Sequence, residues 1–126
     1  MKGESTMSTN WAEHIRNGIN NYQEEALNFI KEEKYAVAAS QLVNIVYAIN
    51  LGYEAMPPTS ASATLGAHIL RLKAGLEFLR RCLEKKYDKK EKLLDNIKPA
   101  MEGVEMTIPL VELGISSFLQ VETAEE

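Results

Sequence analysis

The stretch LGAHILRLKAGLEFLRRCL, residues 65–83, decides the fold class of this chain. Its isoleucine and leucines recur at alternating steps of four and three residues, which places them on one side of an α-helix. Over about three heptads, this spacing forms a seam of the kind that packs helices in coiled coils. The seam residues are Leu65, Ile69, Leu72, Leu76, Leu79 and Leu83. We therefore expect a helix that starts near Ser60 or Ser62, with another helix approaching closely at Gly66 and Gly75.

Two further helices are predicted before this stretch. Apolar residues at helical spacing predict a helix over residues 11–32, with Asn10 as its N-cap. From residue 35 to a stop near Gly52, apolar residues surround most of the helix circumference, so this helix is expected to be the most buried. The segment 56–60 contains two prolines, which cannot continue a helix, and it is predicted to be a loop.

The C-terminal part is also predicted to be helical. One helix is expected to begin at about Lys89. Pro99 and Pro109 each suit the first turn of a helix, so residues 99–121 predict either two short segments or one kinked helix. No run of alternating β-branched residues predicts a strand. The expected fold class is all-α, a bundle of four to five helices with short connections and one proline-rich loop at 56–60.

The size and composition are those of a single globular domain. The chain has 126 residues, of which 45% are hydrophobic and 25% charged. We expect a flexible N-terminal tail at 1–8, one helical domain at 9–121 and an acidic tail at 122–126. No stretch approaches the roughly 20 consecutive apolar residues of a membrane span. The N-terminus lacks the apolar core of a signal peptide, so a cytoplasmic location without membrane attachment is expected.

The charges are sorted along the chain. Ten of the 14 basic residues, but only five of the 18 acidic ones, lie in the segment 71–98, which therefore carries a net charge of +5. The remaining four basic and 13 acidic residues give −9, and the sum is the net −4 of the whole chain. Sorting of this kind favours an encounter with an acidic partner or with another copy of the chain. Interleaved acids in the basic segment are also typical of a solvated helix face.

Residues 22–50 resemble a known helix hairpin. Aromatic and small residues stand at the packing positions of a single tetratricopeptide-type repeat: Tyr22, Ala26, Phe29, Tyr35, Ala38 and Leu42. The resemblance implies a hairpin that binds a peptide or a partner helix. Two helices joined by a tight turn also produce this pattern, because close packing requires small residues.

Residues that carry catalytic or metal chemistry are sparse. A zinc site needs four clustered ligands, but the chain has three Cys and His residues in all: His14, His68 and Cys82. Neither histidine follows a Glu at the spacing of di-metal bundles, and neither has a nucleophile beside it. The basic neighbours of Cys82 could lower the pKa of its thiol, and the alternative is an ordinary thiol on the flank of a helix. These neighbours are Arg80, Arg81, Lys85 and Lys86. We expect no enzyme activity, no cofactor and no bound metal.

A second apolar row indicates association with another protein. Leu70, Ala74 and Phe78 recur every four residues on the side opposite the seam, and a bundle helix needs only one apolar face. We expect a non-catalytic protein that self-associates, as a homodimer or higher homo-oligomer, or serves as an adaptor or scaffold. Its expected partner interface is this row with a basic rim of Arg71, Arg81 and Lys85. The alternative is nucleic-acid binding through Arg80, Arg81, Lys85, Lys86, Lys89 and Lys90, although the pI of 5.3 is low for that function.

Overall fold

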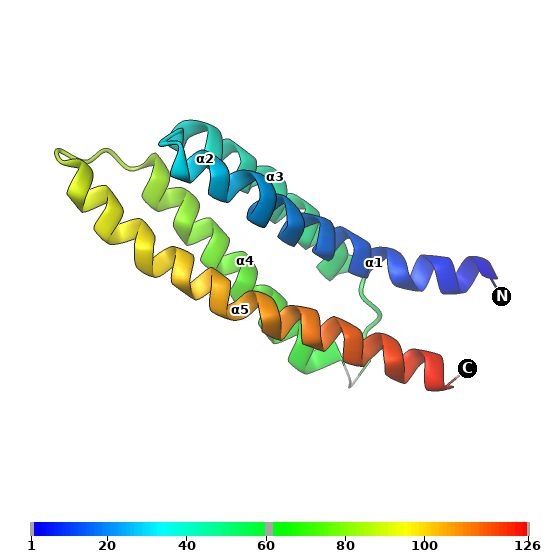
Figure 1. Ribbon diagram of the computed structural model, residues 1–126. Helices are drawn as coiled ribbons and strands as arrows, with labels where there is room; N and C mark the ends of the chain where they lie inside the picture. The colour runs from blue at the N-terminus through cyan, green and yellow to red at the C-terminus, as the bar shows by residue number, and fades with distance from the viewer. Residues whose placement is uncertain (1, 60–61, 126) are drawn as a thin grey trace.

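The computed structural model describes the backbone of residues 2–59 and 62–125, and the side chains of residues 10–59 and 62–120. Every regular element in this part is a helix, which confirms the all-α class (Figure 1). The elements are α1 (Lys2–Asn21), the π-helical turn η1 (Tyr22–Ala26), α2 (Leu27–Lys31), α3 (Tyr35–Ala55), α4 (Ser62–Glu84) and α5 (Lys90–Glu125). Because α1, η1 and α2 follow without a break, they form one rod, and the described chain forms four rods.

Rods that are neighbours in sequence are neighbours in space. α1 packs along α3, α3 along α4, and α4 along α5, whereas α1 and α5 touch only lightly. Figure 1 shows the four rods side by side, with the start of α1 and the end of α5 at the same end of the bundle. This is the up-down-up-down topology that short connections favour. One long side of the bundle, between the first rod and α5, is therefore less closed than the other three.

The predicted seam of α4 lies in the core, and all six of its members are buried. Burial of such side chains away from water is the main stabilising term in folding. At the open side, Trp11 of α1 meets Phe118 of α5 edge to face, with ring centroids 5.2 Å apart and an interplanar angle of 87°. This aromatic pair joins the first and last rods near their common end.

Glycines allow α1 and α3 to approach closely. Gly52 was expected to end its helix, but α3 continues to Ala55. A Cβ atom at Gly52 would lie 2.5 Å from the Trp11 carbonyl oxygen, so the glycine serves helix contact and not helix termination. The expected close approach on α4 holds at Gly75, where a Cβ would lie 3.2 Å from Val104. At Gly66 the same test finds only ordinary contact distances.

Helices α1 and α5 both continue into the segments that were predicted to be tails. α1 begins at Lys2 and runs through Asn10, so Asn10 is not an N-cap and the predicted tail at 1–8 is largely helical. Helix α5 likewise runs to Glu125, through the predicted tail at 122–126.

Helix α5 is continuous across both prolines. Of the two predictions for residues 99–121, a single helix is therefore confirmed, and two short segments are wrong. Pro99 and Pro109 are both exposed. The carbonyl groups that they leave without an amide partner therefore lie toward solvent, where water replaces the lost bond. On the opposite side, buried Ile108 and Val111 anchor α5 in the bundle.

Specific hydrogen bonds hold the short connections between the helices. After α2, Glu33 adopts a left-handed conformation with φ of 64°, and the Lys34 amide donates to the Phe29 carbonyl oxygen at 2.8 Å. The proline-rich loop is non-helical from Pro57 to Thr59, as predicted, while Ser60 lies outside the described residues. The Ser62 hydroxyl donates to the Thr59 carbonyl oxygen at 2.6 Å.

Candidate functional site

The outer side of α4 carries the predicted apolar row. Leu70 is 44% exposed and Phe78 is 53% exposed, and Ala74 between them is also exposed. The seam on the other side of the helix is buried, so α4 has two apolar faces in the folded chain. Exposed apolar groups that form a continuous row mark interaction sites more often than isolated ones do.

Basic side chains lie beside this row. Arg71, Arg81 and Lys85 are all exposed. The Lys85 ammonium lies 5.6 Å from the centroid of the Tyr87 ring, a cation–π distance. Among the described side chains, none of the three basic groups forms an ion pair. They remain free to meet acidic groups of a partner.

Helix α3 adds a second exposed apolar row, which the sequence analysis missed. Tyr47 is 65% exposed, and Val43 and Leu51 one turn to either side are exposed as well. The prediction that this helix is the most buried was therefore wrong, because the bundle covers only the sides of α3 that face α1 and α4. The Lys73 ammonium donates to Asn50 Oδ1 at 2.8 Å and ties α3 to α4 next to this row.

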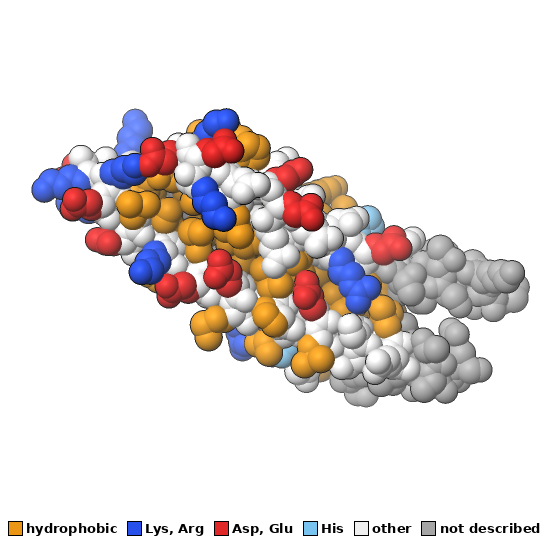
Figure 2. Space-filling model, in the orientation of Figure 1, with side chains coloured by type: hydrophobic (Ala, Val, Ile, Leu, Met, Phe, Trp, Pro, Cys, Tyr) orange, Lys and Arg blue, Asp and Glu red, His pale blue; other side chains and the backbone are white. Residues whose placement is uncertain are grey.

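A third exposed apolar row lies on α5. Met106 is 75% exposed and Leu113 is 67% exposed, with Leu110 between them. Figure 2 shows hydrophobic side chains along the outer edge of this helix. A notch of about 300 Å³ lies beside Leu110 and Leu113, lined on the α4 side by Thr64 and His68. This row was not predicted, because its spacing continues across Pro109, which was taken as the start of a new helix.

The open side of the bundle contains an apolar groove between α2 and α5, also visible in Figure 2. The groove has a volume of about 490 Å³, and apolar residues line it: Ile30, Tyr35, Leu94, Ile97 and Met101. Its rim carries both signs of charge, including an ion pair between Lys90 and Glu33. Nearby, burial and, to a lesser degree, the Glu105 carboxylate raise the pKa of the Tyr22 hydroxyl. This hydroxyl is buried without a hydrogen-bond partner among the described atoms.

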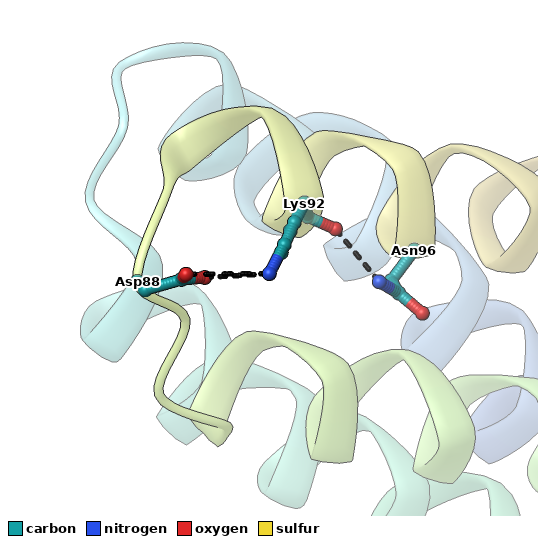
Figure 3. A network of polar contacts seen from close by, with 3 residues as sticks. All are labelled: Asp88, Lys92 and Asn96. Carbon is teal, nitrogen blue, oxygen red and sulfur yellow. Dashed lines mark hydrogen bonds and ion pairs between the residues drawn. The ribbon is translucent and has the colours of Figure 1, made fainter.

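The residues of the alternative nucleic-acid site do not all remain free. Arg80 pairs with Glu84 at 2.9 Å, and Lys90 pairs with Glu33. Figure 3 shows the first turn of α5, where the Lys92 ammonium lies 3.0 Å from the Asp88 carboxylate. The other members of this site, Arg81, Lys85, Lys86 and Lys89, are exposed and form no ion pair within the described part of the chain.

The pKa of the Cys82 thiol is set mainly by burial. Cys82 is buried, and this burial raises the pKa of its thiol, while the neighbouring Lys85 has only a smaller opposing effect. Burial therefore outweighs the basic neighbours that could have lowered this pKa. A neutral, buried thiol is a poor nucleophile.

Metal ligands do not gather within the described residues, where no group of three or more His, Cys, Asp or Glu side chains could hold an ion. His14 is exposed on α1. His68 is half-buried at the notch, and its Nδ1 atom has no hydrogen-bond partner among the described atoms. The two histidines lie on different helices, His14 on α1 and His68 on α4.

Helix α3 is the one helix in the described residues that is long and apolar enough to span a membrane, with a mean hydropathy of 1.2 over 18 residues. A central helix of a soluble bundle has the same composition. Comparison of the chain with protein-family models, curated protein sequences and solved structures finds no match.

Proposed function

We propose that the protein acts through protein–protein association, with the outer side of α4 as its contact surface. The observation that carries the proposal is the exposure of Phe78 and Leu70 in the finished fold, although α4 already buries a complete seam. Burying exposed apolar area yields about 25 cal/mol per Å², so an aromatic side chain is a strong anchor for a partner.

A second copy of the chain is the first candidate partner. The exposed rims of α4 are basic at Arg71 and Arg81, while the sequence outside 71–98 has a net charge of −9. Opposite charges on two copies steer their encounter and set their orientation, even where they add little affinity. Helix α3, which packs along α4, carries a second exposed apolar row with Tyr47 at its centre.

The test is Phe78→Glu, with Leu94→Glu as a matched control. Leu94 is an exposed leucine in the groove, away from the outer side of α4. We expect Phe78→Glu to lower the mass measured by light scattering between about 5 and 200 μM, because a charge in a desolvated contact costs several kcal/mol. Its helical circular dichroism and thermal midpoint should stay near those of the control. An unchanged mass would contradict the proposal.

Nucleic-acid binding is the second candidate, supported by the unpaired lysines at the turn between α4 and α5. Lys85 and Lys86 form no ion pair within the described residues, and they line a hollow of about 530 Å³ there together with Lys92, which pairs with Asp88. Fluorescence anisotropy with single- and double-stranded oligonucleotides at two salt concentrations separates the candidates. Sub-micromolar affinity that falls steeply with salt would favour this second function, since the slope reports phosphate contacts.

A further inference from the structure

The exposed row of α5 belongs to a longer uncharged stripe. Steps of four and three residues connect its members, all of them exposed: Pro99, Gly103, Met106, Leu110, Leu113 and Ser117. This is the spacing of a coiled-coil seam. The bundle does not use it, because α5 faces α4 and the core through other residues, among them Val104, Ile108, Val111 and Ile115. Helix α5 therefore carries one seam for its own bundle and a second one toward solvent.

We infer that a second copy of this chain docks on the α5 stripe, with the two α5 helices antiparallel and crossing near Leu110. The order of side-chain sizes supports this choice. From Gly103 to Ser117 the stripe reads small, large, large, large, small, so it is the same in both directions. In a two-fold antiparallel pair each position meets a counterpart of similar size, as an isologous contact requires.

Shape and charge both fit this arrangement. Small residues at the two ends let the helix backbones approach, while Leu110 meets its counterpart in the centre. Met106 of the second copy then lies over Leu113 and the notch beside it. The stripe contains no charged residue in a chain that is 25% charged, so no charged group lies within the stripe on either copy.

The three large side chains of the stripe supply a little under half of the area of a standard interface. From their exposed fractions, Met106, Leu110 and Leu113 together supply roughly 350 Å² per copy, of the about 800 Å² per partner that a standard interface buries. The α4 residues that line the notch add to this area. Unlike the proposed contact at Phe78, this contact is centred on α5, so the two can be removed separately.

The first test uses Phe78→Glu as the parent protein, which removes the contact of the proposed function. We expect this parent to remain a dimer through α5. Adding Leu113→Glu should raise the dissociation constant of that dimer at least about 100-fold and give a folded monomer. Adding Met106→Glu instead should give the same result, and adding Leu94→Glu should leave the dimer intact. Mass is measured by sedimentation equilibrium, and folding by circular dichroism.

The outcomes distinguish the two surfaces. A parent that is already monomeric overturns the α5 inference and leaves the proposed function standing. A Leu113→Glu protein that stays dimeric also overturns it. If Phe78→Glu has no effect on mass while Leu113→Glu gives a lighter, folded protein, the α5 inference holds and the proposed α4 contact fails.

Orientation is tested by cross-linking. In the antiparallel register residue 103 lies opposite residue 117 of the second copy, whereas two copies of residue 103 lie about 21 Å apart along the helices. We expect the double variant Gly103→Cys and Ser117→Cys to form covalent dimers on mild oxidation, and each single variant to stay monomeric on a denaturing gel. The wild type, with its buried Cys82, is the control. Cross-linking of a single variant to itself, or none by the double variant, overturns the antiparallel contact.

Discussion

Replacing Gly52 by alanine tests how α1 and α3 are held together. An added Cβ would lie 2.5 Å from the Trp11 carbonyl oxygen and 2.6 Å from Ile15 Cγ1. The first of these atoms belongs to the backbone, so no side-chain rotation relieves the overlap. The two helices must move apart along a contact that includes buried Trp11 and Ile15.

The expected cost follows from two opposing terms. Overpacking of this kind costs typically about 1–3 kcal/mol, and the better helix propensity of alanine returns about 1 kcal/mol. Because the backbone contact puts Gly52→Ala at the upper end, we expect a net loss of about 1–2 kcal/mol and a fall in the thermal midpoint of about 4–10 °C. The matched control is Gly66→Ala on α4, since a Cβ there would meet its neighbours only at ordinary contact distances of 3.5 and 3.6 Å. That change should stabilise the protein by about 0.5–1 kcal/mol.

Urea and thermal unfolding followed by circular dichroism, at one fixed protein concentration, measure both variants. The reasoning predicts opposite signs for the same chemical change at two helical glycines. If Gly52→Ala unfolds at the same urea concentration as the wild type or a higher one, the close approach of α1 and α3 at Gly52 is refuted.

Two further predictions concern buried titratable groups. Burial and, to a lesser degree, the Glu105 carboxylate raise the pKa of the Tyr22 hydroxyl above its ordinary value of 10.0. Above about pH 10 the unfolded chain therefore loses this proton more readily than the folded chain, and stability falls as the pH rises. Tyr22→Phe, which removes an unpartnered buried hydroxyl, should match or exceed wild-type stability at pH 7 in urea titrations and lose less stability between pH 9 and 11; an equally steep alkaline loss would contradict this. Cys82 should react with a thiol reagent at pH 8 far more slowly in the native protein than in urea, and equal rates would show that the thiol is exposed.

The class of fold and the main seam could be predicted because both depend on local periodicity. The spacing from Leu65 to Leu83 defines a helix face regardless of what packs against it, and all six seam residues are buried. The row of Leu70 and Phe78 was also found in this way, since two apolar faces on one helix are visible in sequence. Whether a second copy covers that row is not a local property, so it stays a prediction.

Features that depend on tertiary contact were harder to predict. Gly52 resembles a helix end in sequence, but its role depends on the Trp11 backbone some 40 positions earlier. Pro99 and Pro109 resemble helix starts, but their exposed positions let α5 continue. For α3, an apolar circumference predicted burial on all sides, yet the four-rod arrangement leaves one side uncovered at Tyr47.

The topology of the bundle does not account for all of the apolar helix faces. In a four-rod bundle each helix needs one apolar side, and the exposed side of a helix is ordinarily polar. Three helices of this chain depart from that rule, with Tyr47 on α3, Phe78 on α4 and Met106 on α5 all more than half exposed. Fold stability does not account for these side chains, because they contribute little to the core, and exposed apolar rows favour aggregation unless something covers them. The row on α5 is uncharged and has the spacing of a coiled-coil seam, and the row on α4 has a basic rim. Both features distinguish these rows from scattered surface residues. They are consistent with a protein that covers the rows by ordered association.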